Sequence, residues 1–258
     1  MKIIVLMKQV ANKDAVLRIG ADEKWINEGD IAQQTNESDG YALEEALRMK
    51  EAKGEGEVVV CSLGPQSAKT VIKDALARGA DRAIHVVVED SKKLSPFQIA
   101  TAIADAIREE NADMVFSGLQ SDDSSFGQTG VILAELLGIP HATLVIEVDR
   151  TKLEGNVRLK RELESGWYQW FTYQLPALLT IQSGISQIRY ASLKGIMAAK
   201  KKEIRDVTPS IAAFASAQTI EKVYMPLKTK QTQMLGDGNA KAGAVELVEK
   251  LRTEVRVL

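Results

Sequence analysis

The segment from Ser117 to Gly130 has the residues best suited to bind a small molecule: Ser-Gly-Leu-Gln-Ser-Asp-Asp-Ser-Ser-Phe-Gly-Gln-Thr-Gly. It follows a predicted strand and precedes a predicted helix, and its small side chains would let a ligand approach the backbone. Asp122 and Asp123 could accept hydrogen bonds from a ribose or an amine, but their charge would oppose a phosphate. We therefore expect backbone amides of residues 128–130 to hold a phosphate. A nucleotide site and a solvated loop that caps the helix both fit this segment.

Other motifs of nucleotide chemistry and catalysis are missing. Residues 7–14, after the first predicted strand, contain neither the Gly-x-Gly-x-x-Gly of dinucleotide-binding folds nor the Ser-Gly-Gly-x-Asp-Ser of ATP pyrophosphatases. The chain also lacks a Gly-x-x-x-x-Gly-Lys-Ser/Thr loop and a Gly-x-Ser-x-Gly nucleophile turn. His85 and His141 lie in or beside apolar strands with no nucleophile or carboxylate pattern nearby, so we expect structural roles for both. The sequence predicts no catalytic residue and no metal site.

The composition narrows the class of protein. The chain has 258 residues, of which 45% are hydrophobic and 26% are charged, as in soluble globular proteins of one or two domains. A net charge of −2 lacks the basic excess of general nucleic-acid binders. A single cysteine and two histidines exclude a disulfide framework and argue against metal centres. Without a signal peptide or an apolar run near the roughly 18 residues of a membrane span, we expect a cytoplasmic protein.

Predicted strands and helices alternate over the first 150 residues. Short apolar runs predict buried strands, at residues 3–7, 58–63, 82–88, 113–118 and 142–148. Helices are predicted between these strands from apolar residues at helical spacing, with caps or prolines at their starts and glycines at their ends. The alternation predicts an α/β fold with a doubly wound, mostly parallel sheet of the adenine-nucleotide-binding, Rossmann-like kind. The loop that ends at Gly130 then lies at the carboxyl edge of the sheet, where such folds bind ligands.

The pattern changes after about residue 150. Residues 157–163 alternate apolar and charged side chains, which predicts a half-exposed antiparallel strand. Residues 167–173 and 177–182 are predicted to continue this β region, and the aromatic cluster within it suits a sheet core or a subunit interface. We expect a short helix over residues 192–202 and an extended carboxyl-terminal arm that includes a helix over residues 244–252.

A second candidate segment, Asn36–Asp39, opens the first long predicted helix near the ends of the strands. Asn and Ser side chains commonly cap helices by accepting a hydrogen bond from a backbone amide of the first turn. Taken alone, a plain helix cap made by Asn36 or Ser38 explains this segment better than a ligand site does.

Several sequence blocks resemble the β (small) subunits of electron-transfer flavoproteins. They occur in the order found in that family and cover residues 1 to about 205, whereas the last fifty residues match weakly. The blocks are Met7-Lys-Gln-Val, Asn36-x-x-Asp39 followed by Ala42-Leu-Glu-Glu-Ala, Ser62-Leu-Gly-Pro65, Ala75-Leu-Ala-Arg-Gly-Ala-Asp-Arg-Ala, Gly118-x-Gln-x-x-Asp with Gly127-Gln-Thr-Gly, Arg161-Glu-Leu-Glu-Ser-Gly, Leu175-Pro-Ala and Arg189-Tyr-Ala-Ser-Leu-Lys-Gly-Ile-Met.

The resemblance implies a heterodimer with a larger α subunit, which in this family holds most of the FAD. The β subunit encloses that FAD and buries an AMP, which is structural and takes no part in redox chemistry. Electrons would come from acyl-CoA or similar flavin dehydrogenases and pass to a membrane quinone oxidoreductase. The chain would thus be a carrier subunit and not an enzyme by itself. Its parts would be a nucleotide-binding domain (residues 1–188), a partner-recognition loop and helix (189–204), and an arm that packs on the α subunit (205–258).

The resemblance also assigns site residues. The nucleotide pocket would be formed by Leu6, Asn36, Glu37, Ser38, Asp39, Leu63, Gly118, Gln120, Ser121, Asp122, Gly127, Gln128, Thr129 and Gly130. Partner dehydrogenases would contact Arg189, Tyr190, Ala191, Ser192, Leu193, Ile196 and Met197. Leu193 stands where the family has the leucine that inserts into a pocket on the dehydrogenase, as a hot-spot anchor would.

Three departures from the family pattern bear on function. Ile188 replaces the usual proline before Arg-Tyr, and Lys13 or a neighbour stands where many members have a tyrosine against the flavin. Electron-bifurcating members usually have Asp-Gly-Asp-Thr-Ala-Gln-Val-Gly in the nucleotide loop, whereas this chain has Ser-Asp-Asp-Ser-Ser-Phe-Gly-Gln-Thr-Gly. AMP and a non-bifurcating carrier are therefore favoured. The alternatives are a bifurcating subunit that binds a second FAD and uses NADH, and, with less support, an adenine-nucleotide hydrolase.

Overall fold

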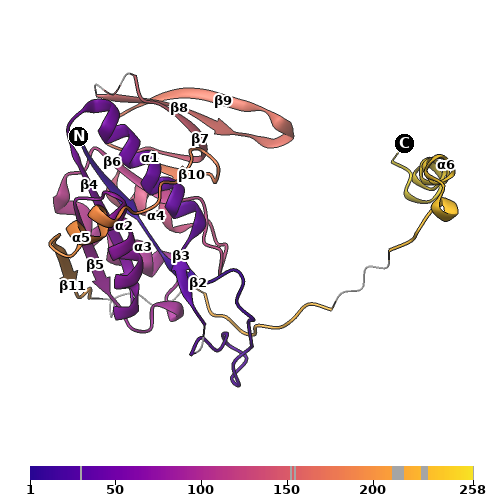
Figure 1. Ribbon diagram of the computed structural model, residues 1–258, viewed down its shortest axis with the longest axis horizontal. Helices are drawn as coiled ribbons and strands as arrows, with labels where there is room; N and C mark the ends of the chain where they lie inside the picture. The colour runs from indigo at the N-terminus through magenta and orange to yellow at the C-terminus, as the bar shows by residue number, and fades with distance from the viewer. Residues whose placement is uncertain (30, 152, 154, 211–217, 228–231, 258) are drawn as a thin grey trace. The chain divides into compact units, whose positions relative to one another are not determined.

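The computed structural model shown in Figure 1 describes residues 1–258 apart from residues 30, 152, 154, 211–217, 228–231 and 258. The chain forms two compact units, Met1–Lys222 and Val223–Leu258. The expected carboxyl-terminal arm, residues 205–258, begins in the first unit and continues through the second. Parts of that arm lie outside the described residues.

The bounds of the elements are as follows. The strands are β1 (Lys2–Leu6), β2 (Gln9–Ala11), β3 (Gln33–Thr35), β4 (Glu57–Gly64), β5 (Arg82–Val87), β6 (Met114–Gly118), β7 (His141–Asp149), β8 (Asn156–Glu162), β9 (Tyr168–Gln174), β10 (Ala177–Ile181) and β11 (Ile204–Val207). The α-helices are α1 (Glu37–Lys53), α2 (Lys69–Arg78), α3 (Pro96–Ile107), α4 (Thr129–Leu137), α5 (Leu193–Ala199) and α6 (Ala240–Lys250). Short 3-10 turns cover Gln66–Ala68, Ser91–Lys93, Arg108–Glu110, Glu164–Gly166 and Gly236–Gly238, and a π-helical turn covers Leu251–Val255. Among the described helices, none has both the length and the apolar character needed to cross a bilayer.

The described residues of the first unit form a nine-stranded sheet with the order β11–β5–β4–β1–β6–β10–β7–β8–β9. The strands from β11 to β7 in this order pair in parallel. At the other edge, β8 and β9 pair antiparallel with their neighbours, and β2 and β3 form a separate ribbon. The predicted α/β class, with a mostly parallel sheet and added antiparallel strands, is confirmed.

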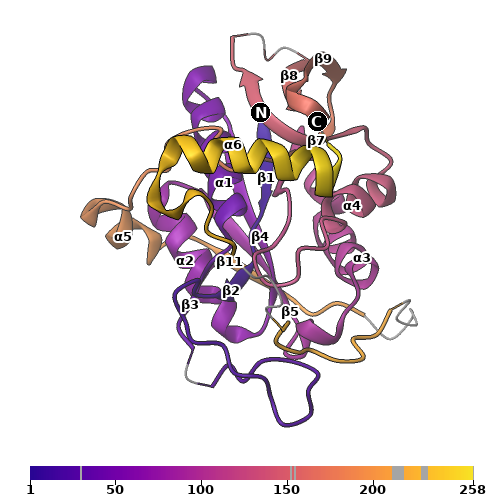
Figure 2. The same ribbon diagram turned by 90° about the vertical axis from the view of Figure 1, so that its right-hand side faces the viewer.

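Helices cover both faces of the sheet. Figure 2 shows α1 and α2 on one side of the central strands and α3 and α4 on the other. Alternate side chains of β1 enter different cores: Ile3 and Val5 pack with α1 and α2, whereas Ile4 and Leu6 pack with α3 and α4. Because successive strand residues point to opposite faces, a strand covered on both sides must be apolar throughout. This requirement explains the uninterrupted apolar runs in the sequence.

The place of β10 differs from the prediction. Residues 177–182 are predicted to continue the β region that begins with the antiparallel strand, and a strand is found there. This strand, β10, does not join the antiparallel strands but lies between β6 and β7 and pairs in parallel with both. All residues of Ala177–Ile181 are buried. Their mainly apolar pattern, broken only at Thr180, is typical of a central strand covered on two faces. The alternating pattern of residues 157–163 does mark an antiparallel strand, β8, as predicted.

The short edge strand β11 was not predicted. It pairs with β5, where His85 is fully buried and contacts the Gly64 carbonyl oxygen at 3.1 Å and Asp206 at 3.3 Å. Lys69 on α2 donates to the same Asp206 carboxylate at 2.7 Å. His85 therefore has the structural role expected from the sequence. His141 is exposed at the first residue of β7.

In the second unit, α6 begins at Ala240 and not at residue 244 as predicted. Asn239 accounts for the earlier start, because its side-chain oxygen accepts hydrogen bonds from the amides of Lys241 at 3.0 Å and Ala242 at 3.2 Å. The helix exposes Val245, Leu247 and Val248.

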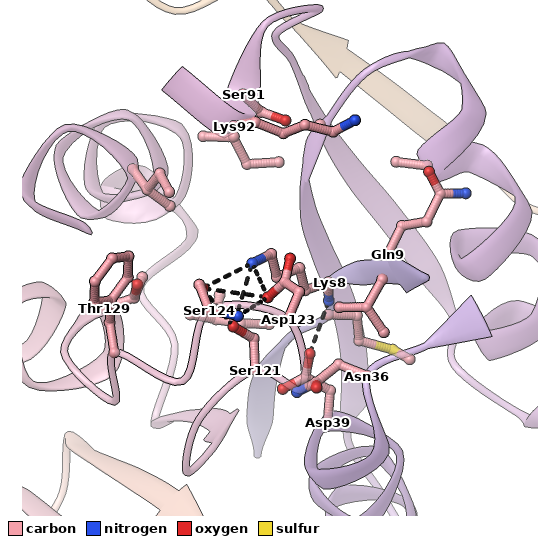
Figure 3. A pocket seen from close by; sticks show the side chains of 18 of the residues that line it. Lys8, Gln9, Asn36, Asp39, Ser91, Lys92, Ser121, Asp123, Ser124 and Thr129 are labelled. Atoms are coloured by element: carbon pink, nitrogen blue, oxygen red, sulfur yellow. Dashed lines mark hydrogen bonds and ion pairs between the residues drawn. The ribbon is translucent and has the colours of Figure 1, made fainter. Parts of the chain in front are cut away.

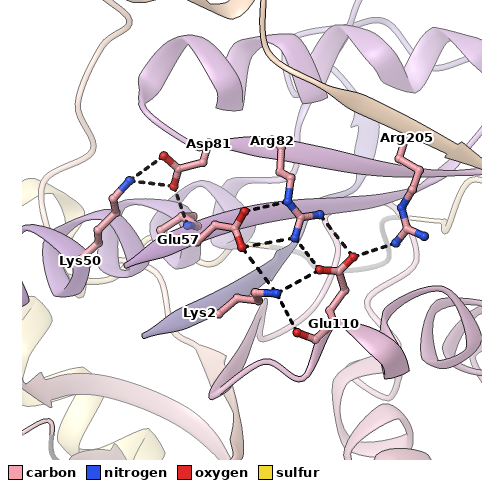
Figure 4. A network of polar contacts seen from close by, with 8 residues as sticks. Lys2, Lys50, Glu57, Asp81, Arg82, Glu110 and Arg205 are labelled. Atoms are coloured by element: carbon pink, nitrogen blue, oxygen red, sulfur yellow. Dashed lines mark hydrogen bonds and ion pairs between the residues drawn. The ribbon is translucent and has the colours of Figure 1, made fainter. Parts of the chain in front are cut away.

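A charged network joins elements at the amino ends of the parallel strands (Figure 4). Glu110 receives hydrogen bonds from Lys2 of β1, Arg82 of β5 and Arg205 of β11. Arg82 also donates to Glu57 of β4 at 2.7 Å. The hydrogen bond from Arg82 is the largest influence on Glu110 and, despite partial burial, holds the pKa of this carboxyl below its usual value.

We expect Glu110→Gln to lower the free energy of unfolding at pH 7 by about 1–3 kcal/mol, because three cations lose their shared anion. A carboxyl whose pKa is lowered by folding stabilises the protein above its unfolded-state pKa, and this contribution disappears as the pH falls through the folded-state pKa. The difference between wild type and variant in chemical denaturation should therefore shrink in acid. Glu109→Gln, at an exposed neighbour, is the control. Equal losses in the two variants would contradict the role of Glu110.

Candidate functional site

A cavity of about 400 Å³ lies at the carboxyl ends of β1, β4 and β6. It is lined by the strand ends, by the loops that follow them and by parts of residues 25–36 and 91–103. Leu6, Leu63 and Ile99 supply apolar walls. The volume is within the range of small-molecule sites, about 300–1,000 Å³. Figure 3 shows the polar side chains that gather at its edge.

Asp39, on the first turn of α1, connects three segments at the floor of the cavity. One carboxylate oxygen accepts a hydrogen bond from the Gly118 amide at 2.9 Å, and the other accepts one from the Lys8 amide at 2.8 Å. Burial raises the pKa of Asp39 to about 6, while the two amides favour the ionised form and limit the rise. The carboxylate thus holds the ends of β1 and β6 against the amino end of α1.

Asn36 and Ser38 hold the loop after β6 and do not cap their own helix. The Asn36 side chain donates to the Gln120 carbonyl oxygen at 3.0 Å and accepts from the Asp122 amide at 2.9 Å. Ser38 also donates to the Gln120 carbonyl oxygen, at 2.8 Å. Asp122 in turn accepts from the Glu37 amide at 3.1 Å. The plain helix cap expected for Asn36 or Ser38 is therefore wrong, because the first turn of α1 is capped from the loop.

Lys8 fixes the next part of the same loop. Its ammonium group donates to Asp123 at 2.6 Å, to Ser121 at 3.2 Å and to Ser124 at 3.4 Å. Burial is the largest influence and would raise the pKa of Asp123. The Lys8 charge and the hydrogen bonds from Lys8, Ser121 and the Ser124 amide together outweigh burial and hold the pKa below its usual value. Both acidic residues of the loop are thus engaged by the protein itself, which reduces their expected conflict with a phosphate.

The amino end of α4 reaches the cavity without a side-chain cap. Gln128 is the N-cap residue but its side chain makes no capping bond, and Thr129 and Gly130 line the cavity. The buried Ser117 hydroxyl has no hydrogen-bond partner among the described residues. It lies so close that a Cβ at Gly130 would come within 2.6 Å of it. Free amides and a partial positive charge at a helix start suit a bound anion.

The structure brings most of the predicted pocket residues to this cavity. Its lining includes Leu6, Asn36, Asp39, Leu63, Gly118, Gln120, Ser121, Gly127, Gln128, Thr129 and Gly130. Three predicted residues lie outside the lining: Glu37, Ser38 and Asp122. Their hydrogen bonds join the loop to the start of α1. Lys8, which does line it, is missing from the predicted site, and Asp123, expected only as a possible acceptor for a ribose or an amine, also lines it. The Met7-Lys-Gln-Val block, which directly follows β1, was the signal for Lys8.

Comparison with known proteins gives a consistent family. A sequence model described as "Electron transfer flavoprotein domain" matches residues 24–212. The electron transfer flavoprotein subunit beta of Methylophilus methylotrophus is 34% identical over 254 residues, covering 95% of this chain and 96% of the relative. The chain belongs to the electron transfer flavoprotein family. The human beta subunit is 34% identical over 212 residues, covering 81% and 82% of the two chains, and the rice mitochondrial beta subunit is 34% identical over 262 residues, covering 100% of both. The resemblance to the small subunits is confirmed.

In this flavoprotein subunit, Arg189 attaches the predicted recognition segment to α1. Its guanidinium donates to Glu44 at 2.9 Å and to Glu51 at 3.0 Å, and its backbone amide also donates to Glu44, at 3.1 Å. Ser192 caps α5 by accepting from the Gly195 amide at 3.0 Å. Arg189 is thus used within the chain. The exposed apolar side chains of the segment are Tyr190, Leu193, Ile196 and Met197.

Gly118 permits the close approach of the loop to α1. A Cβ there would come within 2.1 Å of the Ser38 hydroxyl and 2.4 Å of an Asp39 carboxylate oxygen. We expect Gly118→Ala to lower the free energy of unfolding by about 2–3 kcal/mol, because the added methyl group separates these contacts. Chemical denaturation measures the loss. In the control, Gly29→Ala, the nearest atom of the described residues to the new Cβ would be Asn27 Oδ1, at 3.5 Å. A wild-type free energy of unfolding for Gly118→Ala would contradict the close contact of Gly118 with Ser38 and Asp39.

Proposed function

We propose that this chain is the small subunit of a heterodimeric electron-transfer flavoprotein, which buries AMP in the cavity and helps an α subunit enclose FAD. The complex carries electrons from acyl-CoA or similar flavin dehydrogenases towards a membrane quinone oxidoreductase, and this chain catalyses no reaction by itself. One observation carries the proposal: the uncapped start of α4 faces a nucleotide-sized cavity at the carboxyl edge of the sheet.

The residues of the cavity fit AMP. The backbone amides of residues 128–130, at the start of α4, are suited to its phosphate. The apolar walls at Leu6 and Leu63 are suited to its base. AMP would supply no redox chemistry, and FAD held mainly by the α subunit would supply the electron-carrying chemistry when bound. In this proposal, the residues of this chain bind the AMP and help to enclose the FAD.

The recognition segment provides a docking site for dehydrogenases. Leu193 is 84% exposed on the first turn of α5, and Tyr190 is 95% exposed beside it. The ion pairs of Arg189 with α1 fix the start of this segment, which reduces the conformational entropy lost on docking. A small anchored contact of this kind suits a carrier that must serve several partners.

The carboxyl-terminal arm packs on the α subunit. Its described helix, α6, exposes Val245, Leu247 and Val248, which would lie at that interface. Exposed apolar side chains of this kind are typical of surfaces covered by a partner.

The nucleotide content of the heterodimer tests the proposal. We expect co-expression with the α subunit, denaturation and chromatography of the released nucleotides to give one FAD and one AMP per heterodimer. Two FAD and no AMP would contradict the AMP site and support the electron-bifurcating alternative. A single FAD with no other adenine nucleotide would also contradict the AMP site.

A substitution within the cavity tests whether AMP binds at the start of α4. Thr129→Arg should lower AMP retention because a bulky side chain fills the start of α4. Glu135→Arg introduces the same side chain on the exposed side of the same helix and should keep AMP at the wild-type level. Equal AMP occupancy in the two variants would refute the placement.

Loss of the Leu193 side chain tests the docking site. We expect Leu193→Ala to slow flavin reduction by a partner dehydrogenase roughly 30-fold, as for loss of a binding hot spot, with FAD content unchanged. Stopped-flow measurement of flavin reduction at subsaturating dehydrogenase gives the rate. The control is Leu17→Ala, at an exposed leucine outside the segment. The flavin of this variant should be reduced at the wild-type rate. Wild-type kinetics in Leu193→Ala would remove the assignment.

A further inference from the structure

The cavity contains more negative than positive side chains. Among its described lining residues, the cations are Lys8 and Lys92, and the carboxylates are Glu28, Asp39 and Asp123. Each lysine is already paired: Lys8 with Asp123 at 2.6 Å, and Lys92 with Glu28. A ligand that enters this cavity therefore meets no uncompensated cation among the described lining residues.

The pairing of Lys8 uses its whole donor capacity. An ammonium group has three N–H donors, and those of Lys8 have acceptors on Ser121, Asp123 and Ser124. Asp123 also accepts from the Ser124 amide at 2.7 Å, which keeps the carboxylate in place. Figure 3 shows these bonds gathered on one side of the cavity, with Lys92 on another side. The positive end offered to an anion is then the start of α4, equivalent to roughly half an elementary charge.

We propose that Asp123 is a specificity-determining residue, which by holding Lys8 makes the cavity select nucleoside monophosphates against di- and triphosphates. This inference rests on the proposed nucleotide site. Half a charge and a set of backbone amides suit one phosphate group. A second or third phosphate adds negative charge beside Asp39 and Asp123, and both lysines among the described lining residues are already paired. The side chains of Lys8 and Asp123 are 39% and 18% exposed, so solvent weakens this repulsion but does not remove it.

Competition binding with a charge-neutral variant tests this selectivity. The heterodimer is equilibrated with radiolabelled AMP, and displacement by ADP and ATP gives the ratio of their Kd values to that of AMP. Asp123→Asn keeps an oxygen acceptor for Lys8 and the Ser124 amide and removes only the charge. We expect it to lower the ADP/AMP ratio of Kd values by about tenfold and the ATP/AMP ratio further.

Asp90→Asn is the matched control. Asp90 also pairs with a lysine, Lys93, at 3.0 Å, but neither residue lines the cavity. Its variant should keep both ratios within about twofold of wild type, since screening is strong at exposed sites. A second measurement needs no variant: raising the ionic strength should lower the wild-type ADP/AMP ratio, because salt screens the repulsion.

Each outcome decides a different question. Unchanged ratios in Asp123→Asn, or an equal fall in Asp90→Asn, would overturn the inference while AMP binding by the wild type stands. A wild-type ratio that does not respond to salt would overturn it as well, even if the variant fails to fold. Absence of AMP binding by the wild-type heterodimer would overturn the proposed nucleotide site and this inference with it.

Discussion

The buried carboxylate of Asp39 is the interaction on which the cavity depends. β1 and β6 are neighbours in the sheet, and the amides of Lys8, two residues after β1, and of Gly118, the last residue of β6, donate to the same carboxylate. A buried ionised group is costly unless hydrogen bonds satisfy it. The start of α1 and the ends of β1 and β6 therefore stabilise one another, and displacing any one of the three would weaken the other two. The absence of a side chain at Gly118 is part of the same constraint, because the carboxylate occupies the space a Cβ would need.

Much of the fold was predictable because its determinants are local or periodic. An apolar run such as residues 58–63 has to be covered on both faces, and this predicts a central parallel strand without knowledge of its neighbours. Ser95 and Pro96 begin α3 as expected, with a reciprocal capping pair between Ser95 and Gln98. The loop before Gly130 could be placed at the carboxyl edge of the sheet, because every parallel strand ends on that side.

What could not be predicted depends on distant residues. Sequence order suggests that β10 follows β9 in the sheet, but the strand crosses to a place between β6 and β7. Asn36 has the residue type of a helix cap, yet its partners are 84 and 86 positions away along the chain. The pairing of Lys8 with Asp123 spans 115 positions. None of these pairings leaves a periodic pattern in the sequence. The sequence therefore indicates individual polar residues of the site but not which of them bond to one another.

The fastening of the recognition segment has a consequence for the subunit on its own. Arginine keeps its charge at every physiological pH, so the attachment of Arg189 to Glu44 and Glu51 does not loosen. Tyr190, Leu193 and Met197, which follow this attachment, are exposed. Such a surface is adhesive whenever no partner covers it. The exposed segment therefore lowers the solubility of the chain when the chain is made in excess of its partners.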